Sequence, residues 1–374
     1  MIRVVRGIDW IFVGAILAIV AMSIITLAGF YSSEVRLVTD TLIAKHVFSI
    51  VLGVCIAFSL SFLDYRLLQN SSRSLFIGIV GLLLALFVTG QTLKGAQSWF
   101  TLFGFGIQPV ELAKVVTILL VAKYMATYHR RLSSFWSILF SGIPVMVIVL
   151  LTLAQPDFGS ASMVFMTWLL MIFLAGIRVV HGFYLLLMGV GGFGFLWLFV
   201  FREYQKLRIM TFLNPTADPL GAGYNSIQSM RTVTNGGWFG QGVGAGARYS
   251  VPEVHSDFIF AGFSQGWGFV GVTVYFVLLV VILWRLFSLA MEVRDVFGRM
   301  IILGVASVFL VQTVVNIGMN LGVLPITGVP LPFMSYGGSS MMGFFLMVGL
   351  ILSIQKHRQA KGTVYMRNDQ DIFG

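Results

Sequence analysis

Long apolar runs separated by short polar segments dominate the pattern of this chain. A transmembrane helix needs about 20 consecutive, mostly apolar residues. The runs here are continuous, whereas the strands of a transmembrane barrel would alternate apolar and polar residues. We therefore predict an all-α polytopic membrane protein with about ten transmembrane helices, near residues 9–30, 46–63, 74–90, 110–128, 135–153, 160–177, 180–201, 257–287, 298–321 and 338–355.

Composition supports this class and argues against two others. Of the 374 residues, 58% are hydrophobic and 10% are charged, whereas soluble domains carry about 25% charged residues. The single cysteine, Cys55, lies inside an apolar run, so no intrachain disulfide can form. The net charge is +10, but no soluble segment has a basic cluster with interleaved aromatic residues. Nucleic acid is therefore not an expected partner.

The basic residues predict the orientation of the chain. An even number of helices places both termini on one side, and 15 of the 24 Lys and Arg residues lie in loops on that side. Because cytoplasmic loops carry an excess of Lys and Arg, both termini are predicted to be cytoplasmic. We expect a single integral membrane domain over residues 1–374, with a long extracytoplasmic loop, 202–256, between the seventh and eighth helices.

Polar side chains recur at the predicted outer ends of the helices, where apolar residues would be less costly. Asp257 is a carboxylate at the start of the eighth helix. Glu111 and Lys114 are three residues apart, so they share a helix face and can neutralise each other. Such a pair could serve packing alone or belong to a functional site. Asp157 precedes the sixth helix, where its simplest role is an N-cap, although a cap can also line a site.

Two irregular segments accompany these residues. The glycine-rich run 235–246 has no preceding strand, so we interpret it as a flexible or tightly turned loop and not as a dinucleotide site. The stretch 316–340 is rich in proline and glycine, and irregular backbone at membrane depth requires burial in protein or a cavity. We predict an outward-facing cleft suited to an amphipathic anion. Its candidate carboxylates and cations are Asp257, Asp157, Glu111, Asp218, Lys94, Lys114, Lys206, Arg208, Arg231 and Arg248.

Seven motifs occur in an order that resembles one family. They are KGAQSWF, QPVELAK, AQPDFGSA, DPLGAGYNSIQS, HSDFIFA, NIGMNLGVLP and PLPFMSYGGSS. The chain resembles the SEDS family of RodA, FtsW and SpoVE membrane proteins. It is most like RodA in its short N-terminal tail and in the sequence NIGMNLGVLPITGVPLP. The resemblance implies a peptidoglycan glycosyltransferase that polymerises lipid II on the outer face of the bacterial cytoplasmic membrane. It would act with the elongation machinery and a class B penicillin-binding protein, and an FtsW-like division role is the alternative.

The same resemblance implies roles for individual residues. Asp257 corresponds to the proposed catalytic aspartate, and Glu111, Lys114 and Asp157 are supporting polar groups. The donor linkage is α and the product is β, so one displacement with inversion needs a single base. The leaving polyprenyl pyrophosphate would be stabilised by Lys or Arg, or by a divalent cation such as Mg²⁺ or Mn²⁺. Further candidates for substrate binding or support are Lys94, Lys206, Arg208, Asp218 and Ser335.

The sequence departs from the family pattern at one place. Relatives commonly carry two acids shortly after DFIFA, whereas this chain has Ser264–Gln265–Gly266.

Two other functions are alternatives to the polymerase. A lipid II flippase could use the same cleft, but it would need a polar lining through to the cytoplasmic side. A scaffold that only positions its penicillin-binding partner would leave Asp257 and the cations without a role. The polymerase is therefore the leading hypothesis.

Overall fold

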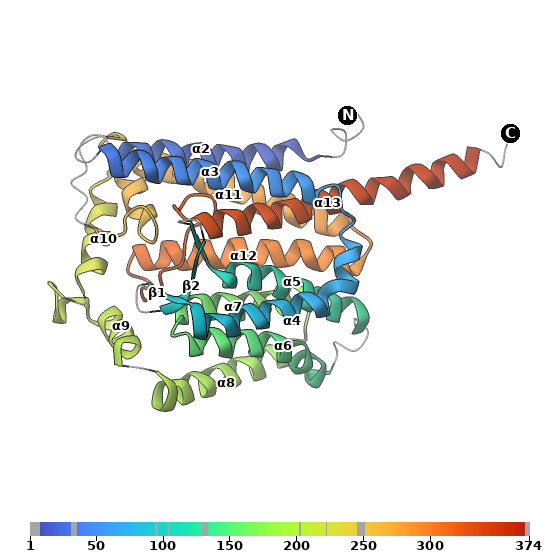
Figure 1. Cartoon of the computed structure of the whole chain (residues 1–374), viewed down its shortest axis with the longest axis horizontal. Helices are drawn as coiled ribbons and strands as arrows, with labels where there is room; N and C mark the ends of the chain where they lie inside the picture. Colours follow the sequence, from blue (N-terminus) through green and yellow to red (C-terminus); the bar gives the residue numbers. More distant parts are fainter. Residues whose placement is uncertain are drawn as a thin grey trace.

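The computed structural model describes residues 8–30, 36–93, 96–102, 105–128, 134–201, 203–221, 223–244 and 251–370. Ten long helices run through this part of the chain, one for each predicted apolar run (Figure 1). They are α2 (Trp10–Phe30), α3 (Arg36–Leu60), α4 (Arg66–Thr89), α5 (Pro109–Tyr128), α6 (Phe135–Ala154), α7 (Phe158–Leu174), α8 (Val179–Phe195), α11 (Ile259–Glu292), α12 (Val296–Asn320) and α13 (Gly338–Gln370).

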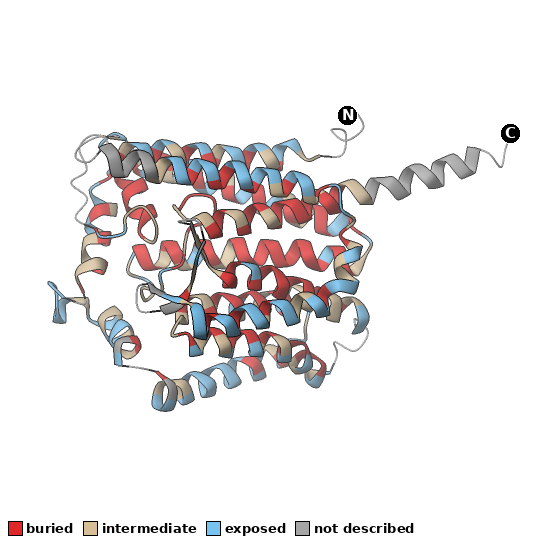
Figure 2. Ribbon diagram, viewed as in Figure 1, coloured by how far each residue is buried: buried red, intermediate tan, exposed pale blue. Residues whose placement is uncertain are grey.

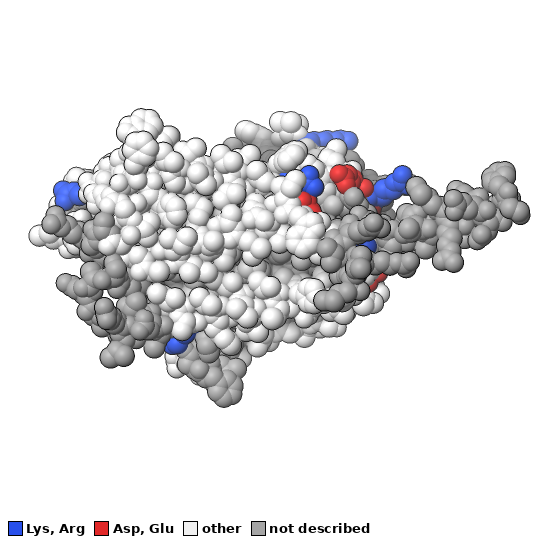
Figure 3. Space-filling view, turned by 90° about the horizontal axis from the view of Figure 1, so that it is seen from above, with Lys and Arg blue, Asp and Glu red and all other residues white. Residues whose placement is uncertain are grey.

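The helices confirm the predicted all-α membrane architecture. Within the described residues, eight helices are long and apolar enough to cross a membrane. Of the other two, α7 is apolar but only 17 residues long, and α5 carries Glu111, Lys114 and Lys123 within its 20 residues. Figure 3 shows a broad band without charged side chains across one face, with the Lys, Arg, Asp and Glu residues toward its ends.

Helices α12 and α13 form the interior of the bundle. In their most apolar segments 78% of the residues are buried, compared with 6% in α8, which lies at the edge (Figure 2). Small residues allow the interior helices to pack closely, as is usual between membrane helices. Gly349 of α13 lies against Ala57 of α3, and Gly304 of α12 lies against Ile118 of α5. The described side chain of Cys55 is exposed on α3.

Short elements lie between the long helices at one end of the bundle. Strands β1 (Gln91–Leu93), β2 (Ala96–Leu102) and β3 (Phe105–Ile107) form a small antiparallel sheet before α5. The predicted loop 202–256 contains helices α9 (Glu203–Leu213) and α10 (Tyr224–Thr234), with a 3-10 turn, η3 (Pro215–Ala217), between them. A π-helical turn, η2 (Leu196–Val200), follows α8. The segment between Asn320 and Gly338 has no helix or strand, which confirms the predicted irregular connection.

The glycine run packs against a break in α11. Gly268 has φ of +66°, so the helix is interrupted there, and a Cβ at this position would lie 2.2 Å from the backbone nitrogen of Gly240. The backbone N–H groups of Phe269 and Val270 donate to the carbonyl oxygens of Gly237 (2.8 Å) and Trp238 (3.1 Å). The run is therefore a tightly turned loop that accepts hydrogen bonds at the helix break, where only glycine allows so close an approach.

Candidate active site

Asp257 lies immediately before α11, and two asparagines of α12 hold its backbone. The Nδ2 atoms of Asn316 and Asn320 donate to the carbonyl oxygen of Asp257 at 2.9 and 3.2 Å. Asn316 also donates to the carbonyl oxygen of Val329 (2.7 Å), and the Oδ1 atom of Asn320 accepts from the backbone nitrogen of Ala261 (3.1 Å). Both asparagines are fully buried. The start of α11 is thus fixed to the end of α12 at the position of Asp257.

The carboxylate of Asp257 faces the irregular segment before α13. A Cβ on Gly328 would lie 3.4 Å from its Oδ2 atom, and Gly328 has φ of +71°. The hydroxyl of Ser335 donates to the carbonyl oxygen of Ser256 (2.7 Å) and accepts from the backbone nitrogen of Leu331 (2.8 Å). Ser335 therefore holds the backbone in position beside Asp257.

Glu111 and Lys114 form the ion pair predicted from their spacing. Lys114 Nζ lies 2.7 Å from Glu111 Oε2, and the two side chains are only 3% and 5% exposed. The hydroxyl of Ser340, in the first turn of α13, donates to Glu111 Oε1 (3.1 Å). The Lys114 ammonium also lies 5.8 Å from the centre of the Phe344 ring. The pair connects α5 with α13, and each charge is compensated inside the bundle.

Asp157 is the N-cap predicted for the sixth membrane helix, and it also binds a neighbouring element. Its Oδ1 atom accepts from the backbone nitrogen of Ser160 (3.0 Å). Its Oδ2 atom accepts from the Ser160 hydroxyl (2.8 Å) and from Nε2 of Gln108 (3.1 Å). Gln108 is in turn held at its backbone nitrogen by the Ser339 hydroxyl (3.0 Å). One carboxylate therefore joins the starts of α5 and α7.

The irregular segment brings the two aspartates to the same region. A Cβ on Gly159, two residues after Asp157, would lie 2.2 Å from the carbonyl oxygen of Thr327. A Cβ on the next residue, Gly328, would lie 3.4 Å from Oδ2 of Asp257. The starts of α5, α7, α11 and α13 therefore converge with the end of α12, and they place Asp157, Asp257 and the Glu111–Lys114 pair at one end of the bundle.

The other predicted site residues lie elsewhere or outside the described part. Lys206 is paired with Glu203 at 3.4 Å. Asp218 is exposed, and its Oδ1 atom accepts from the backbone nitrogen of Gly221 (3.0 Å), which closes a turn. Arg208 lines a groove beside Thr327, and Arg231 is exposed on α10. Lys94 and Arg248 lie outside the described residues.

Sequence reasoning missed the residues that orient the carboxylates. Asn316 and Asn320 stand four residues apart in an apolar helix, so they share one face. Polar side chains at this spacing inside a membrane span are a signal that could have identified them. Gln108 and Ser340 were also not predicted, because their partners lie on other helices.

A divalent metal ion held by the protein alone would need several acidic, His or Cys side chains close together. No group of three His, Cys, Asp or Glu side chains able to hold a metal ion occurs among the described residues. A magnesium ion usually needs one or two carboxylates together with substrate phosphates, so a cation bound only by protein does not fit this donor set.

The segment 264–266, where the family pattern led us to expect acids, contacts the glycine-rich loop. Gln265 is 7% exposed, and its Nε2 atom donates to Oε1 of Gln241 (3.0 Å) in the glycine-rich loop. The backbone nitrogen of Gln241 donates to the carbonyl oxygen of Gln265 (2.9 Å). Two neutral amides therefore link α11 to this loop.

Comparisons with known proteins identify the family to which this chain belongs. The family model described as "Cell cycle protein" (FtsW, RodA and SpoVE) matches residues 7–360. The chain belongs to the SEDS family. Stage V sporulation protein E of Bacillus subtilis is 35% identical to this SEDS protein, over 82% of the chain and 84% of the relative. The peptidoglycan glycosyltransferase MrdB of Escherichia coli is 35% identical, over 83% of the chain and 84% of the relative.

Solved structures share the fold along nearly the whole chain. One, described as showing structural coordination of polymerization and crosslinking by a peptidoglycan synthase complex, has a TM-score of 0.80 and 31% identity. The match covers 94% of this SEDS protein and 98% of the chain in that structure. The rod shape determining protein RodA of Thermus thermophilus has a TM-score of 0.69 and 28% identity, over 94% and 97% of the two chains.

The hydrogen bonds of Asn316 give a prediction about stability and activity. Asn316→Leu should lower the free energy of unfolding by about 1–3 kcal/mol, because it removes the donor to two buried carbonyl oxygens, those of Asp257 and Val329. It should also lower kcat more than KM, because Asp257 loses a positioning bond. Thermal unfolding in detergent and initial rates of glycan synthesis measure the two effects.

Gln312→Leu is the matched control. Gln312 lies one helical turn before Asn316 and is equally buried, but its amide atoms have no hydrogen-bond partner among the described residues. This substitution should leave stability unchanged or raise it. Equal losses in the two variants would show that the Asn316 bonds do not support the site.

Proposed function

We propose that this SEDS protein is a peptidoglycan glycosyltransferase that polymerises lipid II, with Asp257 as the general base. The observation that carries the proposal is the placement of Asp257. Its backbone is fixed by Asn316 and Asn320, while its carboxylate is directed toward Gly328 beside the start of α7. Whole-length similarity to peptidoglycan glycosyltransferases supports the same reaction.

The proposed reaction is one displacement at the anomeric carbon of the donor. The acceptor sugar hydroxyl attacks this carbon, and its proton passes to the carboxylate of Asp257. The bond from the anomeric carbon to the pyrophosphate oxygen breaks, and polyprenyl pyrophosphate leaves with the bonding electrons. The anomeric configuration inverts, so no second carboxylate nucleophile is required. Asp157 and the Glu111–Lys114 pair hold the surrounding helices in place.

We place the reaction on the outer face of the bacterial cytoplasmic membrane. The start of α2 and the end of α13 lie at one end of the bundle (Figure 1), and the excess of Lys and Arg in the loops at that end favours the cytoplasm. The helix starts that carry Asp157 and Asp257 then lie at the extracytoplasmic end.

Contacts at the end of the bundle opposite the candidate site favour an enzyme with its active site on one side of the membrane over a transporter. Arg285 Nε of α11 lies 2.5 Å from Asp9 Oδ2 before α2. The hydroxyl of Tyr65 donates to Asp295 Oδ2 (3.1 Å), the N-cap of α12. Burial and the nearby Asp295 carboxylate raise the pKa of Tyr65 to about 12, so this donor stays protonated at neutral pH. In an alternating-access transporter, those of these contacts that join the two moving bodies would have to separate in each cycle.

A cross-link across the terminal end distinguishes the two functions. In a Cys55→Ser background, Asp9→Cys and Arg285→Cys can be joined by a short bifunctional thiol reagent. The cross-linked protein should still convert labelled lipid II into glycan chains at a rate close to that of the untreated variant. Movement of labelled lipid II across vesicles without chain formation, abolished by the cross-link, would favour the flippase.

We assign the activity to cell elongation, with a class B penicillin-binding protein as partner. The RodA-like sequence of the motif NIGMNLGVLPITGVPLP supports this role, as does the fold shared with RodA of Thermus thermophilus. The structure described as a synthase complex supports the partner. Identity by itself does not separate the roles, because SpoVE, FtsW and MrdB relatives are all 35–36% identical. Restoration of rod shape in an elongation-defective bacterium tests the assignment.

A further inference from the structure

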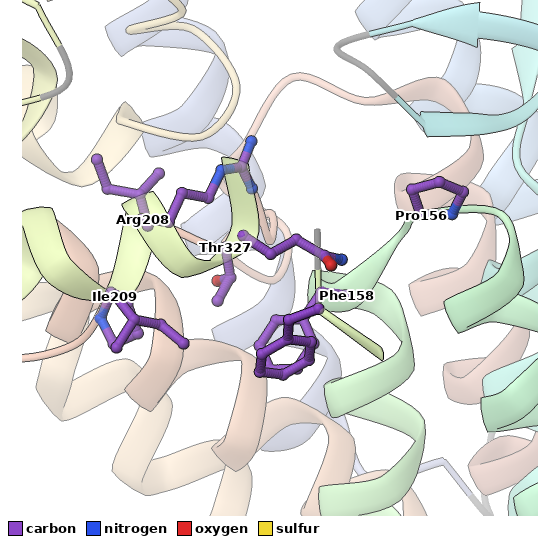
Figure 4. Close-up of a pocket in the computed structure, with 9 residues that line it drawn as sticks. Pro156, Phe158, Arg208, Ile209 and Thr327 are labelled. Carbon is purple, nitrogen blue, oxygen red and sulfur yellow. The ribbon is translucent and has the colours of Figure 1, made fainter. Parts of the chain in front are cut away.

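A groove lies between the start of α7, helix α9 and the irregular segment, and two residues that line it are the chain neighbours of Asp157. It is a shallow groove, partly open to its surroundings, and is lined by Pro156, Phe158, Phe201, Gln205, Arg208, Ile209, Pro325, Ile326 and Thr327. Figure 4 shows Arg208 and Ile209 on α9 near Thr327, with the ring of Phe158 beneath them. The groove therefore combines one cation with walls that are mostly apolar.

The spacing on α9 explains why Arg208 faces the groove. Gln205, Arg208 and Ile209 stand at positions i, i+3 and i+4, so they share one face of this helix. Lys206 lies on a different face and is paired with Glu203, which is 93% exposed. Only one of the two neighbouring cations therefore lines the groove.

The opposite wall connects the groove to the carboxylates. Phe158 directly follows Asp157, and Thr327 directly precedes Gly328, whose backbone lies close enough to Asp257 that an added Cβ would be 3.4 Å from its Oδ2 atom. Phe158 and Phe201 pack edge to face at 5.2 Å and supply an aromatic surface next to Arg208. An amphipathic anion in the groove would have its charged group near Arg208, its apolar chain on the aromatic surface and any attached sugar near the aspartates.

We propose that this groove binds the pyrophosphate and first isoprene units of a polyprenyl-linked sugar, with Arg208, rather than Lys206, as the phosphate ligand. The inference rests on the proposed function, because the substrate class comes from it. A guanidinium donates two parallel hydrogen bonds to phosphate oxygens, and the apolar walls select an isoprenoid over free pyrophosphate. Arg208 also faces the group on which negative charge develops when the glycosidic bond breaks.

Binding of radiolabelled farnesyl pyrophosphate to the full-length protein in detergent tests the inference without any polymerisation. Arg208→Ala should weaken binding by about 10- to 100-fold, as expected for lost charge-assisted hydrogen bonds. Lys206→Ala should leave the affinity unchanged, and Arg208→Lys should fall between Arg208→Ala and the unmodified protein. Unlabelled farnesyl pyrophosphate should displace the label at much lower concentrations than inorganic pyrophosphate or phosphatidylglycerol.

Three results would overturn the assignment. They are unchanged affinity in Arg208→Ala, an equal loss in Lys206→Ala, and equally effective displacement by phosphatidylglycerol, which would identify a general lipid headgroup contact. Thermal unfolding without ligand verifies that each variant is folded. If the protein binds the probe through Arg208 but makes no glycan, the groove assignment stands and the polymerase proposal fails. If it polymerises lipid II without Arg208-dependent binding of the probe, the groove assignment fails and the polymerase proposal stands.

Discussion

Replacement of Asp257 by asparagine is expected to lower the rate of lipid II polymerisation by about 10²–10⁴-fold, the usual contribution of a general base. The substitution keeps the size of the side chain and removes its capacity to accept a proton. The backbone should stay in place, because Asn316 and Asn320 bind the carbonyl oxygen of residue 257. The loss should therefore appear in kcat, with thermal stability and KM nearly unchanged. Initial rates with labelled lipid II and thermal unfolding in detergent measure these quantities.

Asp157→Asn is the comparison for this experiment. The asparagine oxygen can still cap α7 by accepting from the backbone nitrogen of Ser160, and its Nδ2 can donate to Gln108 once the Gln108 amide turns to present Oε1, so the geometry at the start of α5 and α7 is largely preserved. We expect a much smaller loss of rate than in Asp257→Asn. A raised KM with normal kcat in Asp257→Asn would mean that this carboxylate binds substrate and does not take the proton.

Lys114→Met is expected to lower the free energy of unfolding by about 3–5 kcal/mol, because it leaves Glu111 charged and uncompensated inside the bundle. Ser340 would remain as a hydrogen-bond donor to the carboxylate, but it carries no charge. Polymerisation should fall as well, since Glu111 connects α5 to α13 beside the aspartates. Thermal unfolding of the purified protein in detergent measures the change.

A double substitution separates the charge from the packing. Glu111→Gln combined with Lys114→Met removes both charges, so it should recover most of the stability lost in Lys114→Met. The exposed pair Lys206–Glu203 serves as a surface control, and Lys206→Ala should cost no more than about 1 kcal/mol. Equal stabilities for Lys114→Met and Lys206→Ala would show that the buried pair is incidental.

Local patterns in the sequence predicted the helices and the contacts within them. Each of the ten apolar runs became a helix, because a continuous apolar stretch can satisfy its backbone in lipid only by forming one. The Glu111–Lys114 pair follows from a three-residue spacing, and the Asp157 cap follows from its place before an apolar run. These features depend only on residues that are close in the chain.

Contacts between distant segments could not be predicted from such patterns. Asn316 and Asn320 hold Asp257 about 60 residues earlier in the chain, which depends on how α11 packs against α12. The glycine run became interpretable only when its partner, the break at Gly268, was known. Arg208 and Lys206 are equivalent cations in the sequence, and only the orientation of α9 separates them.

The most direct test of Asp257 as the base is chemical rescue of Asp257→Ala. This variant leaves space where the carboxylate was, and the bonds to the backbone carbonyl of residue 257 remain. Initial rates of chain formation from labelled lipid II should be very low and should rise with the concentration of added formate, which can accept the proton in place of the side chain. Formate should not accelerate the unmodified protein. A folded Asp257→Ala protein that polymerises lipid II at the unmodified rate without formate would contradict the assignment.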